Sequence, residues 1–140
     1  MTPGTDCDFT LAHAGVDGGA GVGFFLLRER GRGVWRVRRA RAGRPLVTAT
    51  GETAYADFGQ GAREWRLSVR FESNGVDYRQ AAASAGTLAQ LRAFYALAGA
   101  VLTLGGPAGE WYPVRFLALE ERTNPPEPGA TAEVLLAEAL

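Results

Sequence analysis

The sequence predicts a mainly β protein with one α-helix: an antiparallel β-sandwich or barrel flanked by a single helix at about residues 87–98. Residues 63–71 alternate polar and apolar side chains, and residues 111–121 form a long, largely apolar stretch. Residues 87–98 place their apolar side chains on one helical face. A chain of 140 residues is long enough for a single domain with its own core.

The N-terminal residues are polar and rich in glycine. We expect residues 1–21 to form a flexible arm and residues 22–140 to form a single β-rich domain. The short apolar run 22–27 is a strand candidate. Residues 28–33 intersperse arginine with glycine, which predicts the tip of a hairpin or a loop.

A second strand is predicted at residues 34–38. Trp35 and Val37 would lie on one of its faces, and Arg36 and Arg38 on the other.

Turn-forming residues divide the next part of the chain. Ala-Gly-Arg-Pro at 42–45 predicts the end of the preceding strand, and residues 46–50 and 53–58 are further strand candidates. Gly-Gln-Gly at 59–61 predicts a turn before the alternating strand at 63–71.

The C-terminal half contains the helix and three strands. Thr87 or Ser84 can cap the start of the helix, and Gly99 can end it. Short strands are expected at 101–104 and 131–140, on either side of a central strand at 111–121. The predicted core residues of the domain are Trp65, Leu67, Val69, Phe71, Leu91, Phe94, Val114 and Phe116, and the other aromatic residues on these periodic faces, Tyr95, Trp111 and Tyr112, are expected in the core as well.

Charge is distributed unevenly, although the net charge is zero. Residues 28–44 contain eight arginines and one glutamate, a net charge of +7, whereas residues 110–140 carry −4. This basic segment could be a solvated or intrachain-paired surface, a protein interface, or a surface that meets a phosphate backbone. We predict a protein interface and keep nucleic acid as the alternative, with these residues on the basic face: Arg36, Arg38, Arg39 and Arg41.

The sequence contains few residues that could form a catalytic or metal site. Cys7 is the only cysteine and His13 the only histidine, so they supply at most half of a tetrahedral zinc shell. The chain has no lysine, and therefore no P-loop lysine. We expect no catalytic residues, metal or cofactor, and hence no enzyme. No secretory signal pattern and no apolar run of about 20 residues is present, so we expect no membrane association.

The order of elements after residue 59 resembles that of phage tail proteins. A Trp-containing strand is followed by a Leu-x-x-Leu-x-x-Phe-Tyr helix, a short strand, a glycine-rich loop and the strand Gly-Glu-Trp-Tyr-Pro-Val-Arg-Phe at 109–116. This pattern is similar to the N-terminal domain of siphophage distal tail proteins and of related minor tail proteins, over residues 57–140. We expect no second, C-terminal domain of the distal-tail type, so the chain could equally resemble a tail-tube, tail-terminator or other small tail-tip subunit.

The resemblance implies a structural virion protein that forms or joins a ring around the tail lumen. By analogy the ring would be a hexamer, assembled in the host cytoplasm with other tail proteins. The alternative function is a small soluble β-barrel or sandwich that binds a ligand or nucleic acid.

Overall fold

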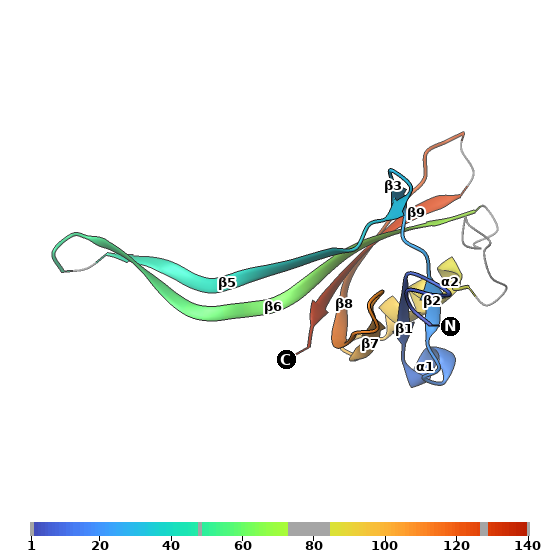
Figure 1. Ribbon diagram of the computed structural model, residues 1–140, viewed down its shortest axis with the longest axis horizontal. Helices are drawn as coiled ribbons and strands as arrows, with labels where there is room; N and C mark the ends of the chain where they lie inside the picture. The colour runs from blue at the N-terminus through green and yellow to red at the C-terminus, as the bar shows by residue number, and fades with distance from the viewer. Residues whose placement is uncertain (1, 48, 73–84, 127–128, 140) are drawn as a thin grey trace.

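The computed structural model describes residues 2–47, 49–72, 85–126 and 129–139. As predicted, the fold is mainly antiparallel β-sheet with one substantial helix (Figure 1). Seven strands form a sheet in the order β2-β1-β7-β8-β9-β6-β5, and β3 and β4 form a separate two-stranded sheet. The elements are β1 (Phe9–Ala12), α1 (Ala14–Asp17), β2 (Val22–Phe24), β3 (Arg28–Glu29), β4 (Arg32–Gly33), β5 (Arg36–Val47), β6 (Thr53–Phe71), α2 (Leu88–Ala96), β7 (Leu102–Gly105), β8 (Trp111–Arg122) and β9 (Ala130–Glu138).

The sheet curls until its first strand comes back to β6. Beyond β2, Leu26 forms an antiparallel bridge with Val69, and the Leu27 amide donates a 2.7 Å hydrogen bond to the Ser68 carbonyl. The chain then forms the β3–β4 hairpin. After it, β5 begins to pair with β6 at Arg36, which lies opposite Arg66. These contacts close the sheet around its core, which makes the domain barrel-like.

In the structure the N-terminal segment pairs with the barrel, whereas its composition suggested a flexible arm. β1 pairs with β2 and with β7, and Phe9 and Leu11 are fully buried. The Phe9 ring stacks on Phe24 at a centroid distance of 5.4 Å. A four-residue strand between polar and glycine-rich flanks has too little alternation to be recognised from sequence, although burial of its two apolar side chains favours its place in the sheet.

Strands β5 and β6 are much longer than predicted. The breaks expected at 42–45 and 59–61 lie inside continuous strands, and β5 runs without interruption to Val47. Two register shifts, between Arg39 and Arg41 and between Arg41 and Gly43, accommodate the irregular sequence as β-bulges. Because β5 is an edge strand, the proline at 45 does not interrupt a ladder on its outer side.

The core lies between the inner face of the curled sheet and α2. Of the eight predicted core residues, seven are buried and Phe116 is half-buried beside them. Along β9, Ala132, Val134 and Leu136 point inward. The C-terminal strands occur where the sequence predicted them, and β8 is the central strand of the sheet.

Helix α2 begins at the cap that the sequence indicated. The Gln90 amide donates to Thr87 Oγ1 at 3.2 Å, and the Thr87 amide donates to Gln90 Oε1 at 3.0 Å, which is a capping box. Leu88, Leu91 and Phe94 form its buried face. In the described part of the chain, neither helix has the length and apolar character needed to cross a membrane.

Candidate assembly surface

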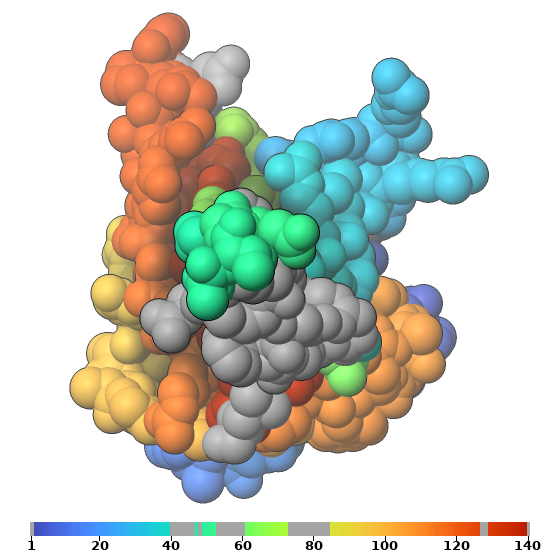
Figure 2. Space-filling model, turned by 90° about the vertical axis from the view of Figure 1, so that its left-hand side faces the viewer, coloured from blue at the N-terminus to red at the C-terminus, as the bar shows by residue number. Residues whose placement is uncertain are grey.

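The β5–β6 hairpin projects from the barrel. Pairing between β6 and β9 ends at Glu64 and Ala137, and beyond this point β6 pairs with β5 alone among the described strands. Figure 1 shows this two-stranded ribbon extending away from all other elements, and Figure 2 shows its tip standing in front of the body. At about 3.3 Å per residue, the seven residues from Arg41 to Val47 span about 20–25 Å.

The predicted basic face lies at the base of this hairpin. Arg36, Arg38 and Arg39 are exposed, and the side chain of Arg41 lies outside the described residues. Arg36 and Arg38 share a face because they are two residues apart in a strand, whereas Arg39 points to the opposite face. Arg36 Nη2 lies 3.3 Å from Glu29 Oε1, with both side chains about two-thirds exposed.

Two shallow hollows lie beside this face. A hollow of about 160 Å³ is lined by Arg36, Val37, Arg38, Glu64 and Arg66. A smaller one of about 50 Å³ lies nearer the β3–β4 hairpin and also includes Arg36 and Arg66. Pockets for small-molecule ligands usually enclose about 300–1,000 Å³. Both hollows are smaller than that range.

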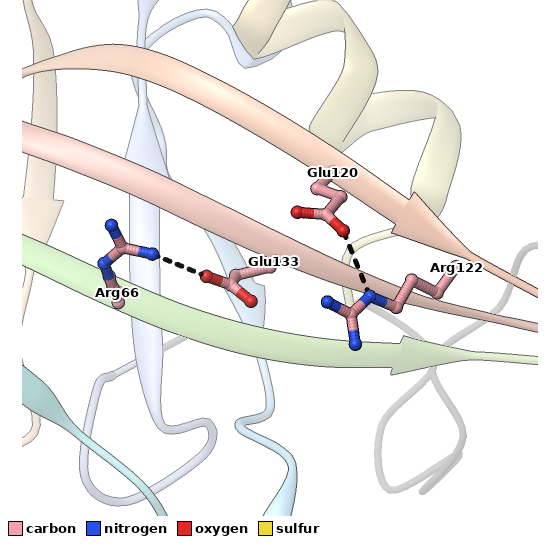
Figure 3. A network of polar contacts seen from close by, with 4 residues as sticks. All are labelled: Arg66, Glu120, Arg122 and Glu133. Atoms are coloured by element: carbon pink, nitrogen blue, oxygen red, sulfur yellow. Dashed lines mark hydrogen bonds and ion pairs between the residues drawn. The ribbon is translucent and has the colours of Figure 1, made fainter.

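Glutamates of the acidic C-terminal segment are paired within the chain. On the outer face of β6, β8 and β9, Arg66 lies 3.1 Å from Glu133 and Arg122 lies 3.0 Å from Glu120 (Figure 3). The contrast between a basic and an acidic segment is consequently smaller in the structure than in the sequence. Exposed ion pairs contribute only about 0–1 kcal/mol each, so these groups can change partners at little cost.

A further ion pair connects α2 to β8. Arg92 donates to both carboxylate oxygens of Glu121, with Nε lying 3.0 Å from Oε2. The hydrogen bond from this guanidinium lowers the pKa of Glu121 below its ordinary value.

Arg63 holds the base of the hairpin against the barrel. Its Nε lies 3.0 Å from Glu138 Oε2, and its guanidinium stands 4.7 Å from the centre of the Tyr112 ring. The Tyr112 ring in turn contacts Trp65 at a centroid distance of 4.9 Å. Arg63 is therefore a clamp between β6, β8 and β9 at the point where β6 leaves the sheet.

We expect Arg63→Met to loosen the hairpin without unfolding the barrel. The variant retains an apolar stem but loses a partly buried ion pair and a cation–π contact, together about 1–2 kcal/mol. Hydrogen exchange of the backbone amides next to residue 63 should become faster, whereas that of β9 amides near Val134 should not change. An unchanged exchange rate at these amides would mean that the backbone hydrogen bonds between β5 and β6 are sufficient to keep the hairpin base ordered, without Arg63. Arg70→Met, on the same strand, is the matched control.

The exposed apolar side chains form a feature that the sequence analysis missed. Trp111, predicted in the core, is 70% exposed, and Tyr95 on α2 is 46% exposed. Period-two alternation along β8 could have revealed the position of Trp111. It shares a face with Pro113 and Arg115, while Tyr112 and Val114 occupy the inner face.

The two residues considered for chemistry have structural environments. His13 caps α1, since its Nδ1 accepts a 2.9 Å hydrogen bond from the Gly15 amide. Cys7 is buried, and burial raises the pKa of its thiol to about 11, from an ordinary value of 9.0. Within the described ranges, no cluster of histidine, cysteine and carboxylate side chains could hold a metal ion.

The raised pKa of Cys7 predicts a loss of stability at high pH. Between about pH 9 and about pH 11 the unfolded thiol releases its proton while the folded one keeps it. The free energy of unfolding should therefore fall as pH rises through this window, by at most about 2–3 kcal/mol. Cys7→Ala should lack this component in denaturant titrations from pH 8 to pH 11. Equal pH slopes for both proteins would contradict the prediction.

Comparison with known proteins gives a match in structure but none in sequence. No protein-family model and no curated protein matches the chain. A solved structure described as the tail of an empty GTA particle, computed with helical refinement and C6 symmetry, superposes with a TM-score of 0.57. The match covers 100% of this chain and 96% of that chain, at 14% sequence identity. At this identity the likeness establishes a shared fold.

Proposed function

We propose that the protein is a structural subunit of a phage-like tail, located in the virion. In this proposal it forms or joins a six-membered ring around the tail lumen, assembled in the host cytoplasm with other tail proteins. The observation that carries the proposal is the fold match over nearly the full length of both chains, to a particle tail with C6 symmetry. The alignment spans the residues of both the barrel and the projecting hairpin.

Two positions in the tail are consistent with this role. Helical symmetry in the matched particle favours a ring that repeats along the tail. The resemblance of the strand at 109–116 to distal and minor tail proteins favours a single ring at the tail tip. A soluble module that binds a ligand or nucleic acid is the remaining alternative; the two hollows beside the basic face are smaller than usual small-molecule pockets.

Electron microscopy and sedimentation of the purified protein test the proposal. We expect sixfold rings, either alone or after mixing with tail proteins encoded by neighbouring genes. Stacks of rings would favour the repeating position, and single rings would favour the tip. A monomer at every concentration, and no incorporation into rings with those proteins, would overturn the proposal.

The basic face should determine how fast the copies associate. Reversal of Arg36, Arg38 and Arg41 to glutamate should slow assembly at low salt, because charged rims mainly affect orientation and association rate. The folded monomer should be retained, since Arg36 and Arg38 are exposed. Light scattering at low and high salt measures the rate.

The β3–β4 hairpin supplies a matched control. Reversal of Arg28, Arg30 and Arg32 changes the charge equally on another exposed element. If both triple variants assemble at the wild-type rate, the basic face has no role in association. Its salt-dependent affinity for nucleic acid is then the measurement to make.

A further inference from the structure

Two arginines lie directly opposite each other where β5 begins to pair with β6. In the register of these strands, Arg36 is the partner of Arg66. Directly opposite residues project their side chains from the same face of a sheet, and like charges in this arrangement are destabilising. Both side chains are more than half exposed. An anionic group placed between the two guanidinium groups would remove this repulsion.

The chain's own glutamates neutralise this arginine pair only in part. Arg36 lies 3.3 Å from Glu29, and Arg66 lies 3.1 Å from Glu133 (Figure 3). Each ion pair uses one nitrogen of a guanidinium group that has five N–H donors. Both glutamates line the smaller of the two hollows, and neither lines the larger one. Donors of both arginines therefore remain for a group in the larger hollow.

The larger hollow is the more basic of the two. It has a volume of about 160 Å³, and its charged lining residues are Arg36, Arg38, Arg66 and Glu64. Arg38 lies opposite Glu64 in the strand register, yet no ion pair joins them. Within the described ranges, the Arg38 side chain has no hydrogen-bond or ion-pair partner. Three arginines and one glutamate give this lining a net charge of +2, which suits a charge-assisted hydrogen bond to an oxyanion.

A single carboxylate matches this surface better than a nucleic-acid backbone. Three glutamates lie among the arginines of the two hollows: Glu29, Glu64 and Glu133. Double-stranded DNA carries one negative charge per about 1.7 Å of helix axis. A backbone that crossed this surface would place phosphates beside the glutamates as well as beside the arginines. One carboxylate side chain can enter the larger hollow without that repulsion.

We propose that the larger hollow receives an acidic side chain of a second copy of the chain, whose carboxylate bridges Arg38 and the Arg36–Arg66 pair. A second copy supplies the required charge, because the chain is neutral and the residues outside 28–44 carry −7. The donating and receiving surfaces differ, so the contact is heterologous and its repetition gives a ring or a helical stack. The inference rests on the proposed function and names the group that the basic face binds.

The absence of lysine from the sequence allows a direct test. A carbodiimide joins an amine to a carboxylate that touches it, and Arg38→Lys or Arg66→Lys introduces the only side-chain amine of the chain. Assemblies mixed from ¹⁴N- and ¹⁵N-labelled copies are cross-linked, digested and mapped by mass spectrometry, which separates bonds between copies from bonds within one chain. We expect both variants to form a covalent dimer through an aspartate or glutamate of the second copy.

Arg122→Lys is the matched control for the cross-linking. Arg122 is an exposed arginine on the same outer face, it lies 3.0 Å from Glu120, and it lines neither hollow (Figure 3). Its amine should react within the chain only.

Glutamine variants test the same contact through affinity. Arg66→Gln should weaken assembly at least about tenfold, because a guanidinium that loses water in an interface contributes more than an exposed one. Arg122→Gln removes the same charge from the same face and should weaken assembly less than about twofold. Both variants should keep the circular dichroism spectrum of the folded protein, since both arginines are largely exposed.

The outcomes separate this inference from the proposed function. If the amines react only within the chain, with Glu64 or Glu133, or if the two glutamine variants assemble equally, the carboxylate contact is wrong and the proposed function stands. A bond to a different tail protein would overturn the choice of a second copy. No bond between copies, with a loss of oligothymidylate affinity in Arg66→Gln, would overturn the carboxylate in favour of a phosphate. If the wild-type protein forms no ring under any condition, the proposed function itself fails.

Discussion

Replacing Phe9 with alanine is expected to lower the free energy of unfolding by about 3–5 kcal/mol. The ring is fully buried between β2 and β7, stacks on Phe24, and lies 6.4 Å from the centre of the Trp35 ring. Its removal would leave a cavity where two β-strands meet the aromatic core. Urea titration followed by tryptophan fluorescence gives the value.

A matched substitution distinguishes a packed N-terminal strand from a flexible N-terminal arm. Thr5→Ala changes an exposed residue of the same segment and should alter stability by no more than about 0.5 kcal/mol. If Phe9→Ala also costs less than about 1 kcal/mol, residues 1–21 behave as the flexible arm that their composition suggested. Hydrogen-exchange protection at Leu11 should agree with the titration, because β1 pairs on both sides.

The sequence predicted the elements whose side chains obey a single strong period. The strand at 63–71 forms the inner part of β6, with Trp65 and Phe71 buried, and the Thr87 cap and one apolar face predicted α2. In both elements one face is in the core and the other is in solvent. The period of the apolar residues therefore predicts which side chains are buried.

The length of the β5–β6 hairpin could not be predicted, because the local sequence contains turn signals inside both of its strands. The sequence at 42–45 and 59–61 carries the glycine and proline that normally end a strand. Both segments are nevertheless inside long strands, since two strands that pair with each other can absorb such residues through bulges and a free edge. The turn predictions at 42–45 and 59–61 were therefore wrong, because the pairing between β5 and β6 extends through both segments.

The candidate surface was predicted only in part. Arginine density predicted the basic face; Arg36 and Arg38 are exposed, and the role of this face as an interface stays a prediction. The exposure of Trp111 was not predicted, because counting it as a core aromatic overlooked that it alternates with Tyr112. An assembly surface on a sheet uses the same apolar residues as a core, and only their register tells the two apart.

The packing of α2 gives the second large expected effect. Phe94→Ala should lower the free energy of unfolding by about 3–5 kcal/mol, because this fully buried ring joins the helix to the inner face of the sheet. Tyr95→Ala, one position along the helix, is the matched control. Tyr95 is 46% exposed and meets the edge of Phe116 at 5.3 Å, so its loss should cost about 1 kcal/mol. Comparable losses for both variants would show that α2 does not present the Phe94 face to the sheet, and that the barrel is closed by strand pairing alone.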